Sequence, residues 1–180
     1  MKLLKLIAIG FGVLLAVLVL IGYLLPHTYH VERSLIIRAK PEQIHAQVDN
    51  LKMWPEWTAW TVARFPDMKI RFEGPESGVG AIYYWEGKQT GAGKLKLTAS
   101  DPAKGVRYDL DFENGKYLSK GGLAYEATAE GTKVTWSNDG DLGGNPINRW
   151  FGLMMDGMMG PDFATGLKNL QGRLETAKAP

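Results

Sequence analysis

The C-terminal stretch NPINRWFGLMMDGMMGPDFATGLKNLQGRL, residues 145–174, decides the fold. Asn145 is a favourable N-cap, and Pro146 suits the first position of a helix. The apolar side chains that follow recur with the 3.6-residue period of an amphipathic helix, at Ile147, Trp150, Phe151, Met154, Met155, Met158, Met159, Phe163, Leu167, Leu170 and Leu174. The stretch therefore predicts one long C-terminal helix, with a bend at Gly160-Pro161 because an interior proline removes a helical hydrogen bond.

Upstream of this helix, most segments alternate apolar and polar residues, which is typical of a strand with one buried face. The first strand is expected over 29–37, and the last carries Val134 and Trp136. Five further strands are expected between them, near 68–72, 79–85, 95–99, 106–112 and 122–129. Short glycine-containing turns separate them and indicate antiparallel neighbours. The order predicts an α+β fold in which a curved antiparallel sheet wraps its apolar face around the C-terminal helix.

Two short helical stretches are expected after the first strand. Pro41 opens a helix that ends at Val48, and the aromatic-rich residues 53–60 form a short helix and a loop because Pro55 interrupts them. Ile44 and Val48 give the first helix one apolar edge. We expect these two side chains, rather than His45, to face the core.

The N-terminus is predicted to be a membrane anchor. Residues 6–25 contain no charge, and a helix of about 20 apolar residues spans the ~30 Å hydrocarbon core of a bilayer. The apolar run is longer than that of a cleaved signal peptide, so residues 1–26 are expected to form an uncleaved signal anchor and 27–180 the folded domain. Lys2 and Lys5 place the N-terminus in the cytoplasm by the positive-inside rule, and the domain on the extracytoplasmic side, which is the periplasm in a bacterium.

Small residues recur every four positions in this anchor, at Ala8, Gly12 and Ala16. Such spacing lets a second helix approach closely, which would allow self-association or contact with another membrane protein. Small residues are also frequent in any membrane span. Both interpretations remain open.

Composition excludes several function classes. Two of the 21 basic residues precede the apolar run of the anchor, which leaves 19 basic against 19 acidic residues, so the domain lacks the positive charge that binds nucleic acid. The chain has no cysteine and only three histidines. We recognise no metal-ligand set, serine triad or phosphate-binding glycine loop. The sequence therefore predicts neither a metal nor a cofactor, and it gives little support to an enzyme.

Six short motifs are spread along the domain: Val31-x-Arg33-Ser34, Ala39-x-Pro41-Glu42-x-Ile44, Trp54-x-x-Trp57, Gly78-x-Gly80, Gly131-Thr132-x-Val134-Thr135-Trp136 and Gly166-Leu167-x-Asn169-Leu170. Together they resemble the bacterial SRPBCC proteins, also described as START-like or polyketide cyclase/dehydrase-like, some of which carry an N-terminal membrane helix. The resemblance covers nearly all of 29–176. It implies a helix-grip fold with an apolar cavity between the sheet and the C-terminal helix. Its motifs support the fold and imply no particular activity.

The candidate ligand-binding site is the lining of that cavity. The sheet side would supply Trp57, Trp60, Tyr83, Trp85, Tyr108, Phe112 and Trp136, and the helix would supply Phe151, Met154, Met155 and Met158. Aromatic rings form large rigid walls, and methionine adapts its shape to irregular apolar ligands. Because ordinary cores use the same residue types, a filled core remains an equally open interpretation.

Arg33 is a charged residue on the otherwise apolar face of the first strand. Its guanidinium could bind an anionic ligand head group. Alternatively, it lies exposed near the strand start with its aliphatic stem along the surface. Asp156 shares the polar side of the C-terminal helix with Arg149, and we expect it at the surface.

These observations predict a membrane-tethered domain that binds a hydrophobic small molecule or a lipid. A cyclase- or dehydrase-like enzyme acting on an aromatic or polyketide-like substrate is one alternative, with Arg33, Tyr83 and Tyr108 as its polar groups. A non-catalytic assembly subunit of a membrane complex is another.

Overall fold

The computed structural model describes residues 2–176. The predicted anchor begins at residue 1 and the predicted folded domain ends at residue 180, so residue 1 and residues 177–180 of these two predictions lie outside the described residues. The elements run in the order α1 (Lys2–Leu24), β1 (Thr28–Ile37), α2 (Pro41–Val48), the 3₁₀-helix η1 (Leu51–Glu56), β2 (Lys69–Glu73), β3 (Ile82–Gly87), β4 (Gly91–Asp101), β5 (Gly105–Phe112), β6 (Tyr117–Thr128), β7 (Gly131–Asp141) and α3 (Pro146–Thr176).

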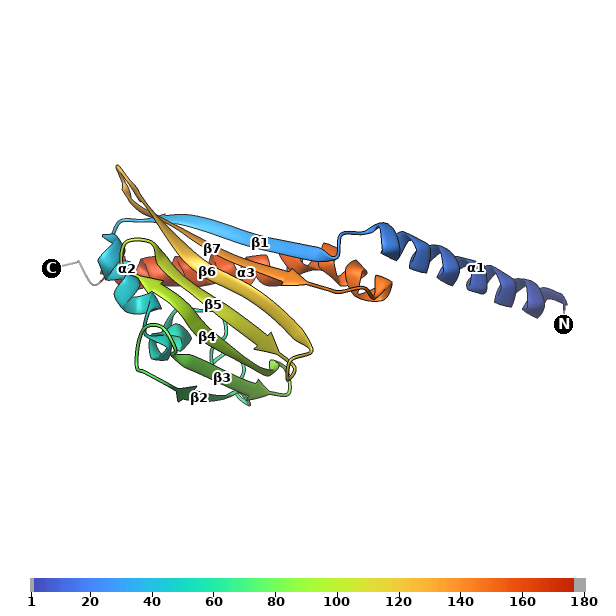
Figure 1. Cartoon of the computed structure of the whole chain (residues 1–180), viewed down its shortest axis with the longest axis horizontal. Coiled ribbons are helices and arrows are strands. Elements are labelled where there is room, and N and C mark those ends of the chain that lie inside the picture. Colours follow the sequence, from blue (N-terminus) through green and yellow to red (C-terminus); the bar gives the residue numbers. More distant parts are fainter. Residues whose placement is uncertain (1, 177–180) are drawn as a thin grey trace.

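The strands form one seven-stranded sheet in the order β1-β7-β6-β5-β4-β3-β2. Every neighbouring pair is antiparallel, so the predicted curved antiparallel sheet and long C-terminal helix are confirmed. Figure 1 shows the long helix α3 lying along one side of the sheet and α1 projecting away from it. Helix α3 packs mainly against β1, and its contacts with β7 are fewer. On the same face of the sheet, Leu97 of β4 and Tyr108 of β5 are buried as well.

The structure corrects two strand boundaries and the alternation of a third strand. Gly78 and Gly80 adopt φ values of 81° and 93°, conformations that glycine tolerates, so the chain turns there and β3 begins only at Ile82. Val79 is consequently exposed rather than part of a strand. A β-bulge after Leu97 turns Ala99 to the solvent side, which breaks the expected alternation. Strand β6 starts at Tyr117, several residues earlier than expected.

Only the second half of α3 contributes fully buried residues to the core. Its buried residues are Gly160, Phe163, Gly166, Leu167 and Leu170, whereas no residue before Gly160 is buried. The helix continues through Pro161 as one element, and the Thr165 hydroxyl donates to the Pro161 carbonyl over 2.8 Å. The two halves of α3 thus have different surroundings.

The expectation for His45 is wrong, because its side chain is buried together with Ile44 and Val48. Helix α2 is short and is enclosed between the sheet and α3, so more than one of its faces is covered. His45 Nε2 lies 3.1 Å from the hydroxyl of Ser100.

Candidate functional site

A row of aromatic side chains lines the concave face of the sheet. We call Phe72, Tyr83, Trp85, Phe112 and Tyr117 the aromatic ladder. Consecutive ring centroids along it are 5.5, 5.8, 6.4 and 6.3 Å apart. Each member contacts the next, so the ladder forms one continuous apolar surface from β2 to β6.

A glycine makes this continuity possible. Gly93 on β4 pairs with Trp85 on one side and with Phe112 on the other. A Cβ atom at Gly93 would overlap the Trp85 ring, so only glycine lets that ring lie flat across β4 and reach Phe112. The spacing of the ladder is therefore set by the pairing of β3, β4 and β5.

Burial in the ladder is greatest at Tyr83 and decreases from there toward Tyr117. Tyr83 is 7% exposed, Trp85 and Phe112 are half-buried, and Tyr117 is 39% exposed. Burial raises the pKa of Tyr83 to about 12, so its phenol is protonated and neutral at physiological pH. The end of the ladder formed by Trp85, Phe112 and Tyr117 combines apolar surface with access from solvent. A site for an apolar ligand requires both.

Four other predicted site residues belong to a packed aromatic core. The Trp136 and Phe163 rings are nearly parallel, with centroids 4.3 Å apart. Trp57 and Trp60 contact Trp136 edge-on, at 5.3 and 6.1 Å. The indole N–H of Trp136 donates to the Tyr108 hydroxyl over 3.0 Å. In this region the side chains fill the space between the sheet and α3.

The predicted helix residues do not all join the sheet residues. Met155 is half-buried and packs against the core. Phe151, Met154 and Met158 are 53%, 56% and 60% exposed, so the structure does not bring them to the aromatic residues. Their assignment to a ligand site stays a prediction.

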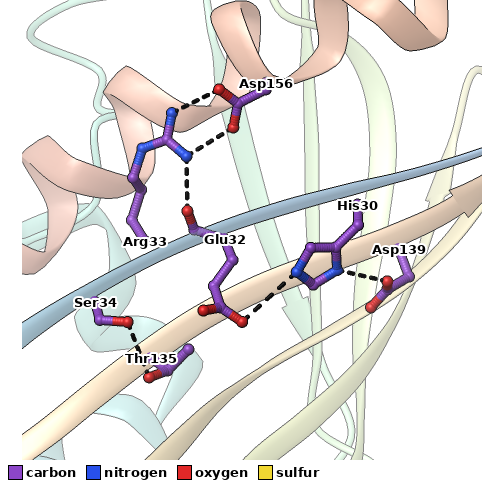
Figure 2. A network of polar contacts seen from close by, with 7 residues as sticks. All are labelled: His30, Glu32, Arg33, Ser34, Thr135, Asp139 and Asp156. Atoms are coloured by element: carbon purple, nitrogen blue, oxygen red, sulfur yellow. Dashed lines mark hydrogen bonds and ion pairs between the residues drawn. The ribbon is translucent and has the colours of Figure 1, made fainter.

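Arg33 is held by an ion pair within the fold. Figure 2 shows its guanidinium reaching from β1 to Asp156 on α3, while Glu32 and Ser34 point to the other side of the strand. The two guanidinium-to-carboxylate distances are 2.6 and 3.0 Å, and a Cβ atom at Gly160 would overlap the guanidinium. The hydrogen bond from Arg33 lowers the pKa of Asp156, and Asp156 raises the pKa of Arg33. An anionic ligand would therefore have to compete with Asp156 for this cation.

A polar cluster lies on the same face of the sheet beyond the ladder. The Tyr29 hydroxyl donates to Asn138 Oδ1 over 3.1 Å, and Tyr108 lies across Gly121 of β6 from Asn138. Burial raises the pKa of Tyr29, and it raises the pKa of Tyr108 to about 12. Asn138 is fully buried, yet its Nδ2 group has no hydrogen-bond partner among the described residues.

Ser119 is buried on the same face, one strand pair from Tyr29, and we call Tyr29, Tyr108, Ser119 and Asn138 the polar cluster. Burying an unpaired amide N–H group is unfavourable, so Asn138 Nδ2 is suited to donate to an acceptor atom of a bound molecule. Sequence reasoning missed Asn138, although it follows Trp136 by two residues and so falls on the same strand face. The signal in the sequence was a polar residue on the strand face that also carries Val134 and Trp136.

A second buried polar group does not have the geometry of a catalytic triad. The Ser100 hydroxyl contacts both Asp49 and His45 Nε2. His45 Nδ1 has no partner in the described structure, whereas in a triad a carboxylate orients that nitrogen. We interpret this group as a structural link between α2 and β4.

A family model described as polyketide cyclase / dehydrase and lipid transport matches residues 28–175. The chain belongs to this family. The match covers the whole sheet and almost all of α3, and it leaves α1 outside. No curated protein matches the chain.

Solved structures of low sequence identity share the fold of this family member. The di-domain aromatase/cyclase StfQ of the steffimycin biosynthetic pathway is 10% identical with a TM-score of 0.63, covering 83% of this chain and 51% of StfQ. Norcoclaurine synthase of Thalictrum flavum, a point mutant in complex with a transition-state analogue, is 15% identical with a TM-score of 0.62, covering 84% and 97%. A Mesorhizobium loti protein is 17% identical with a TM-score of 0.59, covering 84% and 99%. At these identities the likeness shows the shared helix-grip fold alone.

Proposed function

We propose that this chain binds a hydrophobic small molecule or lipid on the concave face of its sheet while α1 holds it at a membrane. The observation that carries the proposal is the aromatic ladder, a continuous row of rings that is half-buried at Trp85 and Phe112 and exposed at Tyr117. The description of the family, which includes lipid transport, supports the same ligand class.

The ladder and the polar cluster suit the two ends of an amphipathic ligand. Phe112 pairs with Tyr117, and the next same-face pair of β5 and β6 is Leu110 with Ser119, so the polar cluster adjoins the ladder. The apolar body of the ligand would lie on the rings of Trp85 and Phe112. A carbonyl, ester or hydroxyl oxygen of the ligand would accept a hydrogen bond from the Asn138 amide.

Helix α1 supports the membrane part of the proposal. It is 23 residues long and contains an 18-residue window with a mean hydropathy of 2.8, so it is long and apolar enough to cross a bilayer. Its two lysines, Lys2 and Lys5, are both in the first turns. A domain tethered on the extracytoplasmic side by the short link 25–27 would stay within reach of lipid-soluble molecules.

Native mass spectrometry of the full chain, released from detergent micelles, tests ligand binding. The wild-type chain should carry an additional molecule of defined mass. Trp85→Ala should weaken binding at least tenfold and so lower the bound fraction, since an aromatic contact contributes about 1.5–3 kcal/mol. Tyr84→Ala is the matched control, because Tyr84 is the neighbouring residue on the opposite face of β3 and contacts Arg71 instead. A chain without any bound molecule, or equal losses in both variants, would contradict the proposal.

A further inference from the structure

The first three turns of α3 carry an exposed apolar stripe. Ile147, Phe151, Met154 and Met158 are 59%, 53%, 56% and 60% exposed. Their spacing of four, three and four residues places all of them on one face of the helix. The next residues on that face are Asp162, Thr165 and Asn169, which are polar. The stripe is therefore confined to the beginning of the helix.

The fold does not use this stripe to pack α3 on the sheet. The opposite face of the same turns carries Asp156, which pairs with Arg33 of β1. Farther along, Phe163 continues that opposite face into the core. Within residues 2–176, the stripe thus presents about three turns of apolar side chains to the surroundings of the protein.

The start of α3 is joined to the end of α1. The indole N–H of Trp150 donates to the Leu18 carbonyl over 3.2 Å. Arg149 donates to the carbonyls of Tyr23 and Leu25 over 2.8 and 3.2 Å, so it caps the C-terminus of α1. A Cβ atom at Gly22 would lie 2.5 Å from the Pro146 carbonyl oxygen, so the two backbones approach closely at that glycine.

This junction fixes the level of the stripe relative to a membrane. Leu18 precedes Leu24 by six residues, which is about 9 Å of helix. If α1 spans the bilayer up to Leu24, as the proposed function holds, the indole of Trp150 lies deeper in the bilayer than Leu24, at the depth of Leu18. The stripe begins beside this indole, at Ile147 and Phe151.

We infer that the first three turns of α3 are immersed in the surface of the bilayer that holds α1, with the stripe facing the acyl chains. Tyr23, Trp150 and Arg149 lie at the junction, and aromatic and basic residues are those that anchor proteins at the interface. Tyr29 is at the start of β1, so the polar cluster would also lie at the membrane end of the concave face. An acyl chain or other apolar ligand would then reach the site from the lipid phase.

Single nitroxide labels on the full chain test this inference, since the wild-type sequence has no cysteine. Phe151→Cys and Met154→Cys place a label on the stripe. Lys168→Cys is the control on the same helix, 14 residues or about 21 Å beyond Met154. Leu14→Cys reports on α1 itself. The variants are reconstituted into phosphatidylcholine vesicles, and the accessibility of each label to oxygen is compared with its accessibility to a water-soluble nickel complex.

The inference predicts that the ratio of oxygen to nickel accessibility is several-fold higher at residues 151 and 154 than at residue 168. Water-like ratios at 151 and 154, together with a lipid-like ratio at 14, would overturn it and leave the membrane anchor intact. A water-like ratio at residue 14 would overturn the anchor and this inference with it. All four labelled positions are exposed, so the labels do not disturb the core.

Discussion

Replacing Phe163 by alanine tests whether α3 closes a filled aromatic core. Phe163 is 1% exposed, and its ring lies parallel to Trp136 with centroids 4.3 Å apart. Truncating a buried phenylalanine to alanine costs about 3–5 kcal/mol, because apolar contact is lost and a cavity remains. With a urea dependence of about 2 kcal/mol per M, the unfolding midpoint should fall by about 1.5–2.5 M.

The assay is urea unfolding of the full chain in detergent micelles, followed by the near-ultraviolet circular dichroism of the tryptophans. Phe163→Leu should lose clearly less stability, because it keeps most of the side-chain volume. Val79→Ala is the exposed control and should stay within about 0.5 kcal/mol of wild type. A shift for Phe163→Ala no larger than that of Val79→Ala would refute the packed core and favour a hollow one.

Three further predictions concern pH, helix glycines and the helix junction. The pKa of Tyr83 is about 12 in the folded domain against 10.0 in a model compound, so its contribution to stability is complete below pH 10 and is lost as the pH rises to 12. Tyr83→Phe should therefore lose less stability than wild type over that interval in urea unfolding. Gly172→Ala should stabilise the domain by about 0.5–1 kcal/mol, because the added methyl group meets open space and alanine favours a helix over glycine. Gly166→Ala should destabilise the domain, because the added Cβ atom would lie 2.8 Å from the Trp136 ring. The midpoints of thermal unfolding of the two variants test both expectations. Arg149→Met should leave the last carbonyls of α1 without their cap, so hydrogen–deuterium exchange should be faster in residues 22–27.

The fold was predictable because its signals are local. Alternation over 29–37 identified β1, and the 3.6-residue period after Asn145 identified α3. The bulge after Leu97 was not predictable, because it depends on the pairing of β4 with β5. The same limit applies to the aromatic ladder, whose contact between Trp85 and Phe112 depends on Gly93 of an intervening strand.

The candidate site was only partly predictable, because α3 is apolar on two faces. One face carries Met155 and Phe163, and the other carries Phe151, Met154 and Met158. Periodicity alone does not say which face meets the sheet. The partner of Arg33 is 123 positions away in the sequence, so the ion pair with Asp156 required the tertiary structure.

The central claim is that an apolar molecule lies on the concave face of the sheet. The most direct measurement is photo-crosslinking in the producing cells, with p-benzoylphenylalanine placed either at Phe112 on the concave face or at Asp109 on the exposed face of the same strand. Mass spectrometry of the purified chain then detects any covalent small-molecule adduct. The account predicts an adduct of defined mass at position 112 and none at position 109. No adduct at 112, or the same adducts at both positions, would contradict it.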